Sequence, residues 1–77
     1  MVKVPNTKPD QVFSFVRRNE HDKVFAVFNF SAEPQNVSFQ DGLFHGKYID
    51  YMSGQEVGIT ASLQLVLKPW EYRIFVM

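Results

Sequence analysis

The segment VFAVFNFS, residues 24–31, is apolar at nearly every position, and it constrains the fold of the chain more than any other feature. Side chains of a β-strand point alternately to the two faces of its sheet, so a half-buried strand normally has a polar residue at every second position. One face of this segment would hold Val24, Ala26, Phe28 and Phe30, and the other would hold Phe25 and Val27. We therefore predict a strand that needs apolar cover on both sides.

The length of the chain limits how much of that cover the chain can supply itself. A chain of 77 residues makes one domain, and a domain of this size buries only about 60% of the surface that its unfolded form exposes. Its net stability should be on the order of 3–5 kcal/mol. The sequence has no cysteine, so neither disulfides nor thiolate metal ligands can add to this stability. The hydrophobic core or a partner must supply it.

The charge balance excludes two classes of partner. Eight basic residues match eight acidic ones, so the chain lacks the positive charge that nucleic acids and anionic membranes attract. It also has no run of about 18 apolar residues that could span a bilayer, and its first ten residues lack the apolar core of a signal peptide. We expect neither a nucleic acid nor a membrane as a partner, and the cellular location stays undetermined.

Short apolar runs rich in Val, Phe, Ile and Tyr recur along the chain and are separated by turn residues. No window of helical length shows the apolar spacing of an amphipathic helix. We predict an all-β fold, a two-layer antiparallel β-sandwich of Greek-key type with about seven short strands. Residues 1–10 would form an extended lead-in and residues 11–77 a single sandwich domain. The predicted strands cover residues 11–18, 23–30, 36–39, 47–51, 58–61, 63–67 and 72–77.

The last third of the chain has the clearest alternation. Leu63, Leu65 and Leu67 share one face, whereas Gln64 and Val66 lie on the other. The turn sequence KPWE, residues 68–71, then leads into a second apolar run. We predict that the two runs form a hairpin with one core face.

The polar residues show no pattern that is typical of catalysis. The carboxylates of the predicted turns belong to Glu20, Asp22, Glu33, Asp41, Glu56 and Glu71. A glycosidase needs two carboxyl groups about 5–10 Å apart across a cleft, and a sandwich this small has little depth for one, so we interpret these residues as solvated loop charges. His21 and His45 stand alone, and we interpret both as exposed loop residues without a metal. No nucleophile elbow or phosphate-binding glycine loop occurs. We predict no catalytic residue, no metal site and no cofactor.

Aromatic residues are unusually frequent, with eight Phe, three Tyr and one Trp. Trp and Tyr are the rings that tolerate a wet edge, whereas Phe favours cores and interfaces. Trp70, in a predicted turn, is therefore the first candidate for stacking on a sugar, although it could equally cap the core or contact a neighbouring domain. The weaker candidates are Tyr72, Tyr48 and Tyr51.

Two Asn-x-Ser triplets begin at Asn29 and Asn36. In a secreted eukaryotic protein such a triplet can accept a glycan. Asn and Ser at the end of a strand can instead bond to the backbone of the turn that follows, and we favour this second interpretation because the triplet is too short to be specific.

Four motifs in order resemble the C-terminal β-sandwich domain of α-amylase-like enzymes, glycoside hydrolase family 13. That domain typically contains an F-x-R strand end, a hydrophobic strand that ends in N-x-S, a Y-x-D-x-x-[ST]-G segment and a final L-x-L-x-P. The corresponding segments here are Phe15-Val16-Arg17, Asn29-Phe30-Ser31, Tyr48-Ile49-Asp50-Tyr51-Met52-Ser53-Gly54 and Leu65-Val66-Leu67-Lys68-Pro69. Each motif is weak alone, and their order and spacing from about residue 11 to the end carry the resemblance.

The resemblance implies an accessory domain that follows a catalytic (β/α)₈ barrel in the same polypeptide and packs against it. The catalytic carboxylates of the family lie in that barrel, so none of them corresponds to a residue of this sequence and the chain alone would not be an enzyme. The implied partners are the barrel and, as a second candidate, an α-glucan such as starch.

Docking on a barrel would require an exposed apolar patch on one sheet, larger than an ordinary monomer shows. We predict that Phe25, Val27, Phe13 and Phe15 contribute to it. Two alternatives remain open from the sequence: a carbohydrate-binding module around Trp70, and an unrelated immunoglobulin-like interaction domain that shares only the sandwich.

Overall fold

The computed structural model describes residues 2–20, 22–40 and 44–77. His21 and the predicted turn at Asp41 and Gly42 lie outside the described residues. The described part contains eight strands and no helix. The strands are β1 (Val2–Lys3), β2 (Val12–Arg18), β3 (Lys23–Asn29), β4 (Gln35–Ser38), β5 (Gly46–Asp50), β6 (Glu56–Ile59), β7 (Gln64–Leu67) and β8 (Tyr72–Val76).

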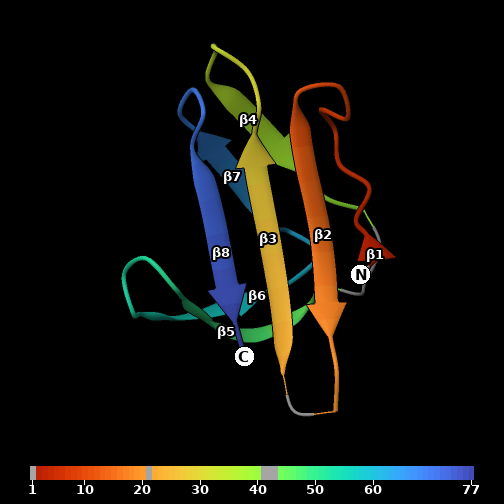
Figure 1. The fold of residues 1–77 in the computed structure, drawn as a ribbon, viewed down its shortest axis with the longest axis vertical. Helices are drawn as coiled ribbons and strands as arrows, with labels where there is room; N and C mark the ends of the chain where they lie inside the picture. Colours follow the sequence, from red (N-terminus) through yellow and green to blue (C-terminus); the bar gives the residue numbers. More distant parts are fainter. Residues whose placement is uncertain (1, 21, 41–43) are drawn as a thin grey trace.

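The strands form two antiparallel layers, which confirms the predicted all-β sandwich. One sheet has the order β1-β2-β3-β8-β5-β6, and the second consists of β4 and β7. Figure 1 shows β2, β3 and β8 side by side in front of β4 and β7. The seven predicted strands are all present, with ends displaced by at most two residues. The eighth strand, β1, lies in the predicted lead-in and pairs with β2.

The predicted hairpin of the last two strands is wrong. β7 pairs with β4 in the small sheet, whereas β8 pairs with β3 and β5 in the large one. The turn between them therefore passes from one layer to the other. Alternation along β7 does mark its core face, with Leu65 and Leu67 buried and Val66 exposed, but the same alternation does not determine which strand supplies the hydrogen-bonding partner.

Strand β3 lies at the centre of the large sheet between β2 and β8. Its inward face holds Phe25, Val27 and Asn29, all fully or almost fully buried. Phe25 packs against Phe75 of β8, with ring centroids 5.8 Å apart, and also against Phe39. The opposite sheet therefore covers the face that carries Phe25 and Val27. The face with Ala26 and Phe28 is the outer one.

The core lies between the two sheets, and among the described residues it is formed by thirteen buried hydrophobic ones. They are Val4, Val12, Val16, Phe25, Val27, Val37, Phe39, Phe44, Tyr48, Ile59, Leu65, Leu67 and Phe75.

Candidate docking surface

The outer side of the large sheet carries a connected group of aromatic rings, which we call the outer aromatic face: Phe13, Phe15, Phe28, Phe30 and Tyr72. Phe13 and Phe28 stand opposite each other in the β2–β3 register, and Phe28 stands opposite Tyr72 in the β3–β8 register. The ring of Phe28 lies 6.1 Å from that of Phe15, 5.8 Å from that of Phe30 and 6.1 Å from that of Tyr72. Phe28 is therefore the centre of the group.

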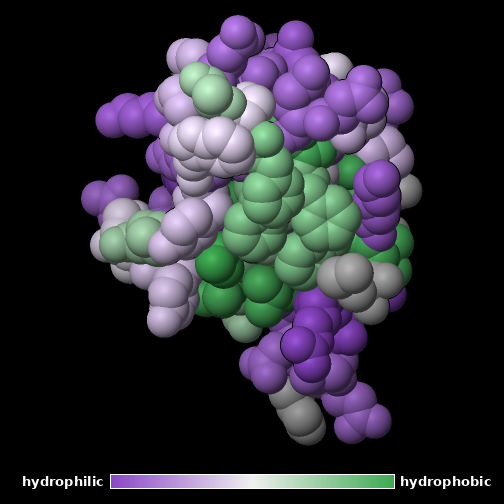
Figure 2. All heavy atoms as spheres, turned by 45° about the horizontal axis from the view of Figure 1, so that its top comes forward, coloured by the Kyte–Doolittle hydropathy of each residue, from purple (hydrophilic) through white to green (hydrophobic). Residues whose placement is uncertain are grey.

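Aliphatic side chains extend this face along β3 and β8. Ala26 pairs with Ile74, and Val24 pairs with Val76, in both cases at outer positions of β3 and β8. Figure 2 shows the result as a continuous hydrophobic area, with hydrophilic residues above and below it. Phe30 keeps 62% of its surface exposed. A contiguous apolar face with exposed aromatic rings is typical of a surface that another protein surface covers.

Two cations lie at the edge of the apolar area. Lys3 of β1 pairs with Phe15, and Arg17 of β2 pairs with Val24, so both occupy outer positions of the sheet. Both residues are exposed. A surface that fits this face should therefore be apolar in the middle and acidic at this edge.

The predicted interface residues are divided between the two faces of the sheet. Phe13 and Phe15 belong to the outer aromatic face. Phe25 and Val27 are wholly inaccessible in the core, so their assignment to a domain interface is wrong. Both faces of β3 are apolar, and a period of two cannot tell which of two apolar faces is the inner one. The outer face that was expected to carry Phe25 and Val27 instead carries Phe28 of β3 and Phe30, which follows this strand.

One of the predicted sugar-binding residues is also misplaced. Tyr48 is only 1% exposed and packs against Phe25 and Phe75, so its ring cannot stack on a sugar. Burial raises the pKa of Tyr48 to about 12, so the phenol stays neutral at physiological pH. Within the part of the chain that the structure describes, its hydroxyl has no hydrogen-bond partner.

His45 is half-buried and not the exposed loop residue that the sequence predicts. Its ring packs edge-on against Phe44, with centroids 4.6 Å apart. Its backbone oxygen accepts a hydrogen bond of 2.9 Å from the Lys23 ammonium. Burial and the nearby Arg18 charge lower the pKa of Lys23. These contacts give His45 a structural role at the edge of the core.

The other three sugar-binding candidates are exposed. Trp70 is 64% exposed and sits in the turn between β7 and β8, where its backbone φ is +61°. This left-handed conformation is rare for a large side chain. A hydrogen bond of 3.1 Å from the Trp70 amide to the Ser31 oxygen holds the turn against the end of β3. Tyr72 belongs to the outer aromatic face, and Tyr51 lies in the β5–β6 turn. Sugar binding stays a prediction for these three residues.

A partly buried ion pair fixes the β5–β6 turn. Arg73 of β8 donates a hydrogen bond of 2.9 Å to the carboxylate of Asp50, at the end of β5. Burial alone would raise the pKa of Asp50, but hydrogen bonds from the Met52 amide and from Arg73, together with the Arg73 charge, hold it below its usual value. Asp50 therefore stays ionised. The sequence pattern indicated Asp50 only as part of the family motif, and it did not indicate its partner.

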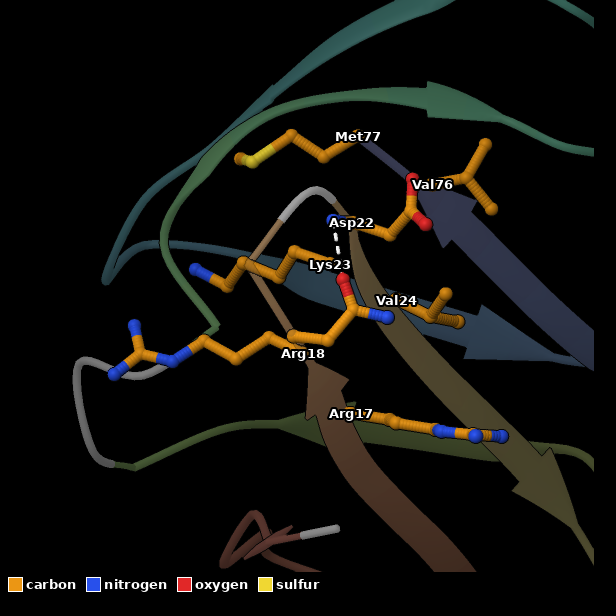
Figure 3. A pocket seen from close by; sticks show the side chains of 8 residues that line it. Arg17, Arg18, Asp22, Lys23, Val24, Val76 and Met77 are labelled. Carbon is orange, nitrogen blue, oxygen red and sulfur yellow. Dashed lines mark hydrogen bonds between the residues drawn. The ribbon is translucent and has the colours of Figure 1, made fainter.

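A hollow of about 360 Å³ lies at the end of the β2–β3 hairpin. Figure 3 shows that the side chains of Arg17 and Arg18 leave β2 in opposite directions, as expected for neighbours in a strand. The hollow therefore does not bring all of its cations to one point, because Arg17 points away from Arg18 (Figure 3). Its lining consists of Arg17, Arg18, Asn19, Asp22, Lys23, Val24, Val76 and Met77.

Neither a metal centre nor a membrane span is found in the residues that the structure describes. Among residues 2–20, 22–40 and 44–77, no three metal-binding side chains lie close enough to hold an ion. The same residues form no helix that is long and apolar enough to cross a membrane.

The geometry defines a class of protein: a small antiparallel β-sandwich whose larger sheet keeps one apolar, aromatic face uncovered. The family model described as "Maltogenic Amylase, C-terminal domain" matches residues 2–74. The chain therefore belongs to the family of maltogenic amylase C-terminal domains. This membership confirms the resemblance to the C-terminal β-sandwich of α-amylase-like enzymes.

Individual relatives agree with this assignment. The α-glucosidases MAL32 and MAL12 of Saccharomyces cerevisiae are each 35% identical to the chain over 68 residues, which is 88% of this chain and 11% of the relative. The chain thus spans about one tenth of the length of these relatives.

Solved structures also share the fold. Gan42B, a GH42 β-galactosidase, superposes over the whole of this chain and 10% of its own, with a TM-score of 0.64 and 21% identity. A catalytic mutant of Gan42B from G. stearothermophilus gives the same TM-score and identity, over 99% of this chain. At this identity the likeness concerns the fold alone.

Proposed function

We propose that this chain is the non-catalytic C-terminal accessory domain of an α-amylase-like glycoside hydrolase that acts on starch or related α-glucans. Its role is to pack against the catalytic (β/α)₈ barrel of the same polypeptide and to stabilise it. Membership in the family supports the assignment to such an enzyme, and the outer aromatic face is the observation that supports docking. By itself the chain is expected to hydrolyse no α-glucan.

The outer aromatic face fits this role energetically. Burial of a Phe side chain contributes about 1.5–3 kcal/mol, and Phe30 still exposes most of its surface. A partner that covers Phe30 and the rings around Phe28 would gain this energy without a change in the sandwich. The barrel surface should place apolar side chains over these rings and carboxylates opposite Lys3 and Arg17.

We expect Phe30→Ser to weaken the complete enzyme much more than it weakens this chain. In the enzyme that contains the chain, the half-life of α-glucan hydrolysis at raised temperature should fall at least about fivefold, which corresponds to a loss of about 1 kcal/mol. In the 77-residue chain, the melting temperature should change little because Phe30 is already exposed.

Val66→Ser is the matched control. Val66 is 69% exposed, much as Phe30 is, but it lies on the outer side of the small sheet. The substitution should leave the half-life of the enzyme almost unchanged. Equal half-lives for Phe30→Ser and Val66→Ser would refute docking through the outer aromatic face.

Trp70 supports a second candidate function, the binding of an α-glucan. A strained backbone that exposes a large indole ring suggests a use for that ring, and Trp70 combines a φ of +61° with 64% exposure. Calorimetric titration of the chain with millimolar maltohexaose should then show saturable heat, which Trp70→Ala removes and Val66→Ala keeps. Absence of binding, or equal heat with Trp70→Ala, would reject this candidate.

A further inference from the structure

The β5–β6 turn, residues 51–55, exposes apolar side chains where polar ones are usual. Tyr51 is 68% exposed, Met52 is 58% exposed, and Ile49 just before them is 48% exposed. Turns at a protein surface usually carry polar residues. Figure 1 shows that the connection between β5 and β6 projects beside β8. An apolar tip on a projecting turn is therefore a feature that the fold alone does not require.

This apolar tip is continuous with the outer face of the large sheet. Ile49 stands opposite Val76 in the β5–β8 register, and Val76 itself lies at an outer position opposite Val24. The Tyr51 amide donates a hydrogen bond of 2.8 Å to the oxygen of Ile74, the residue that lies beside Ala26 on the same face. The turn thus lengthens the apolar surface past β8.

Asp50 holds the turn in one conformation through its backbone and its side chain. Its amide donates to the Gln55 oxygen at 2.8 Å, and its own oxygen accepts from the Gly54 amide at 2.7 Å. Its carboxylate accepts from the Met52 amide at 2.9 Å and from Arg73 at 2.9 Å. Gly54 has a φ of +73°, which favours glycine at this position. The turn is therefore closed on itself and tied to β8.

A preorganised apolar turn is well suited to binding, because little conformational freedom is lost when a partner covers it. We propose that Ile49, Tyr51 and Met52 form a second docking element, which contacts the same catalytic barrel as the outer aromatic face, and that Asp50 is the positioning residue of this element. The inference rests on the proposed function and adds to it the part of the chain that extends the contact beyond the sheet.

Hydroxyl-radical labelling can test both the docking of the outer aromatic face and the second docking element, because it reports the exposure of individual side chains. Labelling of the complete enzyme is compared with labelling of the 77-residue chain. We expect Tyr51 and Met52 to be labelled at least about fivefold less in the enzyme, together with Phe30 and Tyr72. Val66, on the small sheet, should be labelled equally in both.

The possible results separate the two proposals. Protection of Phe30 and Tyr72 without protection of Tyr51 and Met52 would overturn the second docking element and leave the proposed function intact. Absence of protection at all four residues would overturn both. Tyr51→Ser gives an independent check, since it leaves the hydrogen bonds of Asp50 in place, and it should shorten the half-life of the enzyme as Phe30→Ser does.

The positioning role of Asp50 makes a separate prediction. In the complete enzyme, Asp50→Asn should raise the labelling of Tyr51 and Met52 at least twofold, at a temperature where the variant is folded, and should leave Phe30 protected. A purely structural role would lower the melting temperature without this local change. Glu33→Gln removes a charge from an exposed residue and should alter neither. Unchanged labelling of Tyr51 and Met52 in folded Asp50→Asn would refute the positioning role. If Asp50→Asn does not fold, the half-life of the Tyr51→Ser enzyme decides for or against the docking element.

Discussion

Replacement of Phe25 by alanine is expected to leave most of the chain unfolded at room temperature. Phe25 is fully buried at the centre of β3, and its ring lies 5.3 Å from Phe39, 5.3 Å from Phe44 and 5.8 Å from Phe75. The substitution would leave a cavity among these rings, and Phe→Ala in a core costs about 3–5 kcal/mol. A domain of this size has about the same total stability, so this single loss should exhaust it.

Urea denaturation followed by far-ultraviolet circular dichroism measures this effect. The native chain should show a cooperative transition, whereas Phe25→Ala should already lack most of its β signal without urea. Phe30→Ala is the control, because it removes the same kind of ring at an exposed position just past the end of the same strand, and it should cost less than about 1 kcal/mol. A cooperative transition of Phe25→Ala near that of Phe30→Ala would contradict the central place of Phe25 in the core.

The positions of the strands could be predicted from the sequence because local chemistry determines where a strand can continue. Proline, glycine, asparagine and aspartate interrupt the apolar runs at nearly every observed boundary. The family resemblance could be predicted from four short motifs because their order and spacing along the chain are more specific than the sandwich, which unrelated domains share. One of these motifs, Asn29-Phe30-Ser31, does end a strand and begin a turn, as the sequence interpretation favoured.

The sorting of residues between core and surface could be predicted only in part. Leu65 and Leu67 alternate with polar or exposed neighbours, and their face was assigned correctly. Phe25 and Phe28 belong to a strand that is apolar on both faces, so only the position of the small sheet decides which of them is buried. The sequence predicts an exposed, sugar-stacking ring for Tyr48, because it does not show that β5 turns this residue toward Phe25 and Phe75.

Contacts between distant segments were beyond local reasoning. The pairing of β7 with β4, and the ion pair between Asp50 and Arg73, each join residues that are more than twenty positions apart. The buried side chain of Asn29 is the strongest case, because it bonds both to the turn that follows β3 and to the distant Lys68. The sequence indicated that Asn29 bonds to the turn that follows β3, but it did not indicate the bond to Lys68.

Asn29→Asp is expected to destabilise the chain by about 3 kcal/mol or more at neutral pH. The side-chain nitrogen Nδ2 of Asn29 donates hydrogen bonds of 2.9 Å to the backbone oxygen of Glu33 and 3.0 Å to that of Lys68. Its side-chain oxygen accepts from the Ser31 amide and hydroxyl. A carboxylate has no donor, so the substituted side chain would turn a negative charge toward two carbonyl oxygens at a site that is only 2% exposed.

Asn36→Asp is the matched control, because it separates the effect of burial at position 29 from the effect of an Asn→Asp change as such. It makes the same change in the second Asn-x-Ser triplet, at an exposed position of β4, and should change the unfolding free energy by no more than about 0.5 kcal/mol.

The two variants should also differ with pH. Burial would raise the pKa of the new carboxyl at position 29, so the destabilisation should be greatest above that pKa and should shrink as acid restores a proton that can donate to one carbonyl. Urea denaturation at pH 7 and pH 4 measures both effects. Equal stability of Asn29→Asp and Asn36→Asp at pH 7 would contradict this prediction. The hydrogen bonds between β3 and the β7–β8 turn would then not hold this end of the sandwich together, and other contacts would have to keep Trp70 in its left-handed conformation on that turn.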